Sequence, residues 1–153
     1  MAGLLAQLKA LGLSDAQIAA TTIDGKPFHE ATATTKQHRY GRYKSKTEAI
    51  YAAELDAQLR AGEIDAWDYE CWTFRLTDSL EVTKEDGTTK TIPGMRYTPD
   101  FVLILPNRRI RIIEVKGYPR DDAIAKYKMA VDKWPCFEWM MVRRKGSGWE
   151  TIL

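Results

Sequence analysis

A chain of 153 residues with 44% apolar and 29% charged residues can bury one core, which predicts a single globular domain. Its net charge of +2 is too small to imply a polyanionic partner by itself. The sequence has no apolar run of about 18 residues and no signal-peptide pattern, so we expect a cytoplasmic protein without membrane contact. Cys71 and Cys136 are expected to be buried free thiols.

The N-terminal part divides into two segments ahead of the main domain. Leucines recur at helical spacing in residues 3–11 and the run stops at Gly12, so residues 1–20 are expected to form a small helical element. This element either covers one edge of the core or serves in docking or dimerisation. Residues 21–44 are polar and predict a connecting arm, and residues 45–153 contain the main domain.

The end of this arm concentrates positive charge. Five Lys or Arg residues lie between positions 36 and 46 without an acid, interleaved with two tyrosines. Basic side chains suit phosphate contacts and tyrosines can stack on unpaired bases, although a solvated basic loop is an open alternative. The candidate nucleic-acid contacts in this segment are Lys36, Arg39, Tyr40, Arg42, Tyr43, Lys44 and Lys46.

Ser45 begins the first long predicted helix, which extends to Ala61. Ser45 and Glu48 match a capping box. At about 100° per residue, Glu48 also lies on the same helix side as the apolar residues Ala52, Leu55 and Leu59. Because this side should face a sheet, Glu48 is a candidate for an active site as well as for a cap.

Strand-like segments follow this helix. Residues 65–76 contain alternating aromatic side chains, and residues 81–92 contain Asp86-Gly87, a strong signal for a hairpin turn. Residues 137–142 are apolar and β-rich, and the basic residues 143–145, together with Gly146 and Gly148, are expected to form a turn before a final short strand.

A second long helix is expected from Pro119 to the residue before Pro135, with acids in its first turn. Lys126 and Lys128 on this helix either contact phosphates or lie on a solvated surface. The order of helices and strands predicts an α/β fold with a mixed β-sheet flanked by helices. The expected buried face of the second helix contains Ile124, Tyr127, Val131 and Trp134.

The strongest chemical signal lies on two adjoining strand-like runs. Asp100 precedes the first run and Glu114 ends the second. If residues 106–108 form the loop of a hairpin, Asp100 lies opposite Glu114 with Cβ atoms about 5 Å apart, and Lys116 shares their face. Two such carboxylates repel unless a cation lies between them, and magnesium prefers oxygen ligands. A surface hairpin with a salt bridge is the alternative.

Pro99, Asp100, Glu114 and Lys116 resemble the core motif of the PD-(D/E)XK nuclease superfamily, and residues 45–134 are similar to its small phage-encoded members, which include Holliday-junction resolvases. The resemblance implies a restriction-endonuclease-like core in which the acids bind Mg²⁺, with Mn²⁺ as a substitute, and the lysine assists the attacking water.

The resemblance also implies further site residues and a reaction. Glu48 matches the first-helix glutamate of the family, and the carbonyl of Val115 is expected to be a further metal ligand. The implied reaction is phosphodiester hydrolysis that leaves a 5′ phosphate.

The small size, the basic arm and the lack of a sequence-reading module favour a structure-selective DNA endonuclease that acts on Holliday junctions or branched DNA in recombination. Two matched cuts across a junction predict a homodimer. The alternatives are a less selective nickase or end-processing nuclease, and a non-catalytic DNA-binding accessory protein of replication or recombination.

Overall fold

The computed structural model describes residues 39–118 and 120–153. The expected helical element 1–20 and most of the arm 21–44, including Lys36, lie outside these residues. The described part is an α/β structure with a mixed sheet and two helices, as the order of elements predicted. Neither helix is long and apolar enough to cross a membrane.

A five-stranded sheet forms the centre of the described structure, in the order β1-β6-β7-β8-β9. β7 and β8 are parallel and every other neighbouring pair is antiparallel. A parallel pair needs a crossover connection, and the second helix supplies it. The strands are β1 (Ala66–Tyr69), β6 (Phe101–Ile104), β7 (Ile110–Val115), β8 (Glu138–Lys145) and β9 (Gly148–Thr151).

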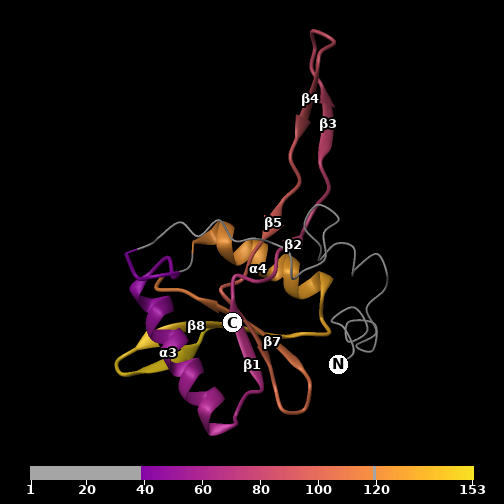
Figure 1. The fold of residues 1–153 in the computed structure, drawn as a ribbon. Helices are drawn as coiled ribbons and strands as arrows, with labels where there is room; N and C mark the ends of the chain where they lie inside the picture. The colour runs from indigo at the N-terminus through magenta and orange to yellow at the C-terminus, as the bar shows by residue number, and fades with distance from the viewer. Residues whose placement is uncertain (1–38, 119) are drawn as a thin grey trace.

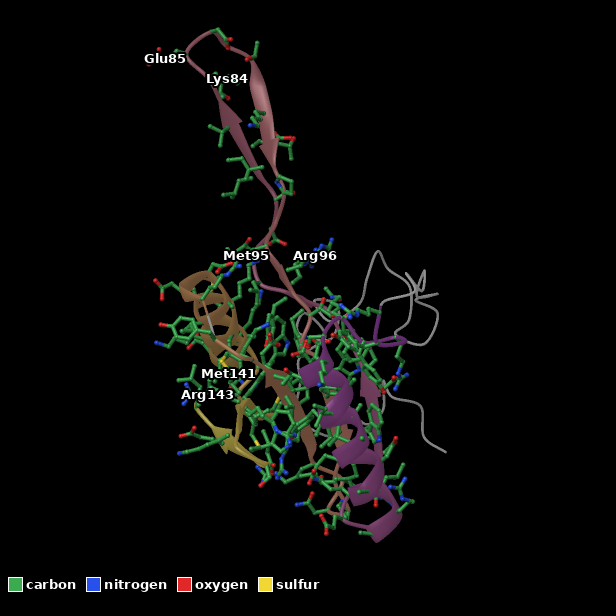
Figure 2. The ribbon with its side chains drawn as sticks, turned by 90° about the vertical axis from the view of Figure 1, so that its left-hand side faces the viewer. Lys84, Glu85, Met95, Arg96, Met141 and Arg143 are labelled. Carbon is green, nitrogen blue, oxygen red and sulfur yellow. The ribbon has the colours of Figure 1, made fainter. Side chains whose placement is uncertain are left out.

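The two helices, α3 (Lys46–Ala61) and α4 (Asp121–Lys133), lie on opposite sides of this sheet (Figures 1 and 2). Alternate residues of the central strands point to opposite faces, so each face builds its own core cluster. The cluster that includes α3 contains Tyr51, Ala52, Leu55, Phe101, Leu103, Ile113 and Val115. The cluster that includes α4 contains Val102, Ile110, Ile112, Tyr127, Ala130 and Trp134.

Local signals explain where α3 begins and ends. The Ser45 hydroxyl oxygen accepts a hydrogen bond from the Glu48 N–H at 3.1 Å, and Gly62 ends the helix with a φ of 74°. Ala52 and Leu55 are buried, as expected. The prediction for Leu59 was wrong, since this side chain is 41% exposed on the last turn of α3, which projects beyond the core.

Helix α4 begins at Asp121, with Arg120 as its N-cap residue, and the predicted start at Pro119 lies outside the described residues. Tyr127 and Trp134 are fully buried as predicted. The prediction that Ile124 and Val131 are buried was wrong, because both side chains are half-buried. Their place is taken by a small residue that the apolar pattern had not singled out, Ala130.

A β-hairpin projects from the body of the molecule, with Lys84 and Glu85 at its far end (Figures 1 and 2). Its strands β3 (Leu80–Thr83) and β4 (Thr89–Ile92) are exposed throughout and pair around Asp86-Gly87, as predicted. Gly87 has a φ of 79°, which glycine adopts without strain. We call residues 80–92 the projecting hairpin.

At the foot of this hairpin, β2 (Phe74–Arg75) pairs with β5 (Arg96–Tyr97). The single strand predicted over residues 65–76 is therefore two strands, β1 and β2, that belong to different sheets. Glu70, with a φ of 47°, lies between them and turns the chain.

The turn predicted at residues 143–145 with Gly146 was wrong for the three basic residues. These residues belong to β8 because they pair with β9, and the Arg143–Glu150 pair adds a cross-strand ion pair of 3.0 Å. The chain turns after them at Gly146, whose φ is 59°, so this part of the prediction is confirmed. Cys71 and Cys136 are free thiols, as expected, but both are half-buried rather than buried.

Candidate metal and nucleic-acid site

The register of the β6–β7 hairpin brings Asp100 and Glu114 together. Phe101 pairs with Ile113 and Ile104 pairs with Ile110, which is the register expected from a loop at residues 106–108. Arg108 closes the turn with a φ of 64° and donates its N–H to the Leu105 carbonyl at 2.7 Å. Continuing this register by one residue sets Asp100 opposite Glu114 on the face that α4 covers.

Asp100 is held by backbone groups in a buried position, with 7% exposure. Its Oδ2 accepts the Val115 N–H at 2.7 Å, and its carbonyl accepts the Glu70 N–H at 2.8 Å. Burial and then the charge of Glu114 raise the pKa of Asp100 to about 8, against the opposing effects of the Val115 N–H and Lys116. The pair of Asp100 and Glu114 therefore holds a proton to higher pH than a free aspartate does, unless a cation replaces it.

Glu114, 5% exposed, has a different partner on each carboxylate oxygen. Oε1 lies 2.7 Å from Nζ of Lys116, and Oε2 accepts a hydrogen bond from the Tyr97 hydroxyl at 2.7 Å. Burial lowers the pKa of Lys116, but the charge and hydrogen bond of Glu114, together with the charge of Asp100, outweigh it and raise that pKa overall. Lys116 is therefore an ammonium group at neutral pH.

Val115, between these two residues, points to the opposite face of the sheet. Its side chain is buried in the cluster that includes α3, as the alternation of the strand predicted. The next residue, Lys116, donates its backbone N–H to the Val142 carbonyl at 2.9 Å, which ties the end of β7 to β8.

Glu48 lies at the start of α3, the helix on the other face of the sheet, and is 8% exposed. Its Oε1 accepts the Ser45 hydroxyl at 2.7 Å, and its Oε2 accepts the Tyr69 hydroxyl at 2.6 Å and the Lys44 N–H at 3.0 Å. The capping role is thus present. Glu48 is also close enough for its charge to add to the raised pKa values of Asp100 and Lys116, as the smallest cause for each.

The oxygen atoms of Asp100 and Glu114 provide some, but not all, of the ligands that a divalent cation needs. Asp100 and Glu114 are two buried carboxylates whose repulsion a divalent ion would relieve. No described residue donates a hydrogen bond to Oδ1 of Asp100, so this oxygen is available as a ligand. As arranged here, however, the described residues contain no group of three or more acids, histidines or cysteines that could hold a metal ion. A third carboxylate ligand would have to come from Glu48 after it releases part of its hydrogen bonding.

The described part of the basic arm packs beside Glu48 and makes contacts within the chain. Arg42 lies 5.4 Å from the ring centroid of Tyr43 and forms an ion pair of 3.4 Å with Asp68. Lys44 forms an ion pair with Glu70. The arm thus reaches the candidate site through its own last residue, because the Lys44 N–H bonds to Glu48.

The predicted nucleic-acid contacts differ in exposure. Tyr43 is half-buried, with its ring in edge contact with Tyr69 at a centroid distance of 5.0 Å, so it is not free to stack on a base. Tyr40, in contrast, is 37% exposed. The exposed candidates are Arg39, Tyr40, Arg42, Lys44, Lys46 and Lys128, whereas Lys126 is half-buried.

Two tyrosines that bond to the carboxylates had not been predicted as site residues. Tyr97 and Tyr69 donate hydrogen bonds to Glu114 and Glu48. Tyr127 is buried, and the charge of Glu114 adds to the effect of burial in raising its pKa to about 12. No short-range pattern pointed to Tyr97 or Tyr69, because their partners are 17 and 21 residues away in the chain.

The fold and the site together define an α/β protein with a buried pair of carboxylates beside a lysine. The chain matches the model of the family described as protein of unknown function (DUF1064) over residues 31–147, and it belongs to this family. Glu48, Asp100, Glu114 and Lys116 all lie within the matched part. No curated protein and no solved structure matches the chain.

Proposed function

We propose that this protein is a magnesium-dependent DNA endonuclease with a restriction-endonuclease-like core of the PD-(D/E)XK type. The observation that carries the proposal is the buried pair of Asp100 and Glu114 with Lys116 in contact at 2.7 Å. Desolvation and repulsion destabilise two neighbouring carboxylates, so the fold tolerates this pair best when a cation neutralises it. A structural salt bridge needs only one acid and one lysine.

The chain supplies the ligands and the charge for hydrolysis. Asp100 and Glu114, joined by Glu48 and the Val115 carbonyl, would hold Mg²⁺ or Mn²⁺. When bound, such an ion lowers the pKa of water and stabilises negative charge on the scissile phosphate. Because burial and the charge of Glu114 raise the pKa of Asp100, cation binding would compete with a proton at this pair.

Lys116 acts as a donor rather than as a base, because its raised pKa keeps it protonated. It would orient the attacking water and stabilise charge that develops on the phosphate oxygens. The water oxygen bonds to phosphorus and gives up one proton to solvent. The bond from phosphorus to the 3′ oxygen breaks, its electron pair stays on that oxygen, which takes a proton from solvent, and a 5′ phosphate remains.

A branched substrate, such as a Holliday junction, fits the arm beside the site. Arg39, Tyr40 and Lys46 are exposed close to the start of α3, where they could contact phosphates and an unpaired base. A homodimer would place two such sites on the two strands that must be cut. A less selective nickase or end-processing nuclease would use the same chemistry without this selectivity.

A non-catalytic DNA-binding accessory protein is a second candidate, and one observation favours it. Both oxygens of Glu48 are engaged in hydrogen bonds with Ser45, Tyr69 and Lys44, and no third carboxylate joins Asp100 and Glu114 among the described residues. A protein of this kind would bind DNA with the same basic residues but would not cleave it.

The deciding experiment incubates the purified protein with a four-way junction and a matched linear duplex, in Mg²⁺, Mn²⁺ or EDTA. We expect metal-dependent cleavage, abolished by Asp100→Asn or Glu114→Gln with the fold and most DNA binding retained. Asp132→Asn, at an exposed position of α4, is the matched control and should cleave normally. Binding without cleavage under every metal condition would establish the accessory protein instead.

A further inference from the structure

We infer that Tyr97 is a positioning residue that orients the carboxylate of Glu114 toward the cation, an inference that rests on the proposed function. Its hydroxyl donates a hydrogen bond of 2.7 Å to Oε2, while Oε1 lies 2.7 Å from Nζ of Lys116. The two contacts hold opposite ends of one carboxylate. Oε1 is then the oxygen that Glu114 presents on the side of Lys116, where a cation would share it.

The position of the Tyr97 ring is determined by packing. Tyr97 is 7% exposed, and its strand β5 pairs with β2 so that Tyr97 lies opposite Phe74, which is fully buried. Its ring centroid lies 6.3 Å from that of Trp139 on β8. A ring packed in this buried position has little freedom to move, so its hydroxyl is a fixed point against which Glu114 is oriented.

Removal of this hydroxyl would affect Glu114 more than it affects the ring. Oε2 would then lie buried without its donor, and the carboxylate could rotate to share both oxygens with Lys116. Partners of metal-binding side chains commonly set affinity in this way, and their loss costs about 10- to 100-fold in metal affinity.

Tyr127, which packs in the core cluster on the same face of the sheet, provides a matched control. It is also buried, and the charge of Glu114 contributes to its raised pKa, so its hydroxyl lies near the same carboxylate. No hydrogen bond joins it to Glu114 in the described part of the chain. Tyr97→Phe and Tyr127→Phe therefore remove the same atom from two buried tyrosines, but only the first removes a hydrogen bond to Glu114.

Isothermal titration of Mg²⁺ into the full chain without DNA tests the inference directly. We expect Tyr97→Phe to raise the dissociation constant for Mg²⁺ by about 10- to 100-fold. Tyr127→Phe should change this constant by less than about 2-fold. In cleavage assays, Tyr97→Phe should raise the Mg²⁺ concentration needed for half-maximal rate, with most of the rate restored at saturation. An unchanged affinity in Tyr97→Phe, or an equal loss in Tyr127→Phe, would overturn the inference.

Thermal unfolding in EDTA gives a second measurement that needs neither metal nor turnover. If Tyr97 acts through Glu114, Tyr97→Phe should lower the Tm in the natural background and have a smaller effect in a Glu114→Gln background, where no buried charge loses its donor. A Tyr97→Phe variant that does not fold, while the double variant does, would show the same coupling. An equal decrease in Tm in both backgrounds would show that Tyr97 contributes only packing.

These measurements separate the inference from the proposed function. Mg²⁺ binding that depends on Tyr97 in a protein that cleaves no DNA would overturn the nuclease and leave the positioning role. Metal-dependent cleavage with Mg²⁺ affinity indifferent to Tyr97→Phe would overturn the positioning role alone. If the natural chain binds no Mg²⁺, both the nuclease function and the positioning role of Tyr97 are wrong.

Discussion

Lys116 and Glu114, two residues apart at the end of β7, form an ion pair of 2.7 Å in which the glutamate side chain is almost completely buried and the lysine side chain is 30% exposed. Residues at this spacing on a strand share one face, so the contact needs no unusual backbone. The lysine extends from a buried charge toward solvent, where a phosphate could approach it.

This pair predicts that Lys116 serves the chemical step rather than metal binding. Lys116→Ala should slow cleavage at saturating Mg²⁺ by about 10²-fold, the loss typical of one stabilising donor, while the Mg²⁺ dissociation constant changes little. Single-turnover rates and calorimetry on the same preparations would measure the two quantities. Loss of Mg²⁺ binding with a normal saturated rate would assign the lysine to the metal site instead.

Asp100 predicts a dependence of stability on pH. Burial and the charge of Glu114 raise the pKa of Asp100 in the folded chain to about 8, whereas an aspartate in the unfolded chain has a pKa of about 4. Between these values the folded state binds more protons, so this group lowers the free energy of unfolding as the pH rises. We expect the Tm in EDTA to fall between about pH 5 and about pH 8, and to fall less in Asp100→Asn than in Asp132→Asn.

Mg²⁺ should reverse this fall, since it replaces the proton as the neutralising charge. A Tm at pH 8 that is unaffected by Mg²⁺ in the natural chain would argue against a cation between Asp100 and Glu114.

Glu48 separates a capping role from a catalytic one when it is compared with Ser45. Ser45→Ala removes the cap hydroxyl and should cost about 1 kcal/mol of stability, with a normal cleavage rate at saturating Mg²⁺ for the folded protein. Glu48→Gln should fold nearly normally and lose activity by orders of magnitude. Thermal melts and cleavage rates of both variants measure the difference. A Glu48→Gln variant that melts earlier but cleaves at the natural rate would leave Glu48 as a cap only.

The arm predicts a salt-dependent affinity for DNA. Neutralising Arg39 and Lys46, both exposed, should lower the magnitude of the slope of log affinity against log salt by roughly 1.8 on duplex DNA, at about 0.9 per phosphate contact. Binding would be measured in Ca²⁺ to limit cleavage, with the exposed Lys145 and Lys90 neutralised as a control for net charge. An unchanged slope would show that Arg39 and Lys46 do not contact DNA phosphates.

The two tyrosines of the arm should behave differently. Tyr40→Ala should weaken binding to junctions or unpaired DNA by about 1 to 3 kcal/mol more than binding to duplex. Tyr43→Ala should chiefly lower the Tm, because its ring packs on Tyr69. Equal effects of Tyr40→Ala on all DNA forms would leave junction selectivity without support from this residue.

The projecting hairpin should be dispensable for the fold. None of its strand residues is buried, so replacing residues 80–92 by Asn-Gly should shift the Tm by no more than about 2–4 °C, the effect of about 1 kcal/mol in a chain of this size. Phe74→Ala at its foot should cost about 3 to 5 kcal/mol, because Phe74 is fully buried. A large loss on removing the hairpin would show that it packs against another surface in solution.

The sequence by itself determined the features that depend on neighbouring residues. Two short apolar runs joined by Pro106-Asn107 predicted the register that sets Asp100 opposite Glu114. Asp86-Gly87 predicted the turn of the projecting hairpin, and Ser45 predicted the start of α3. In each case the deciding interaction is a local turn, a cap or the two-residue period of a strand, which is written in consecutive residues.

Only the tertiary structure decided the features that depend on distant partners. Arg143 continues a strand because Glu150 pairs with it, although a run of basic residues before glycine resembles a turn. The orientation of Glu114 depends on Tyr97, which reaches it from another sheet, and Oε2 of Glu48 accepts a hydrogen bond from Tyr69 on β1. The side-chain partners of a buried carboxylate are set by how the layers pack, so they emerged only once the two faces of the sheet were assembled.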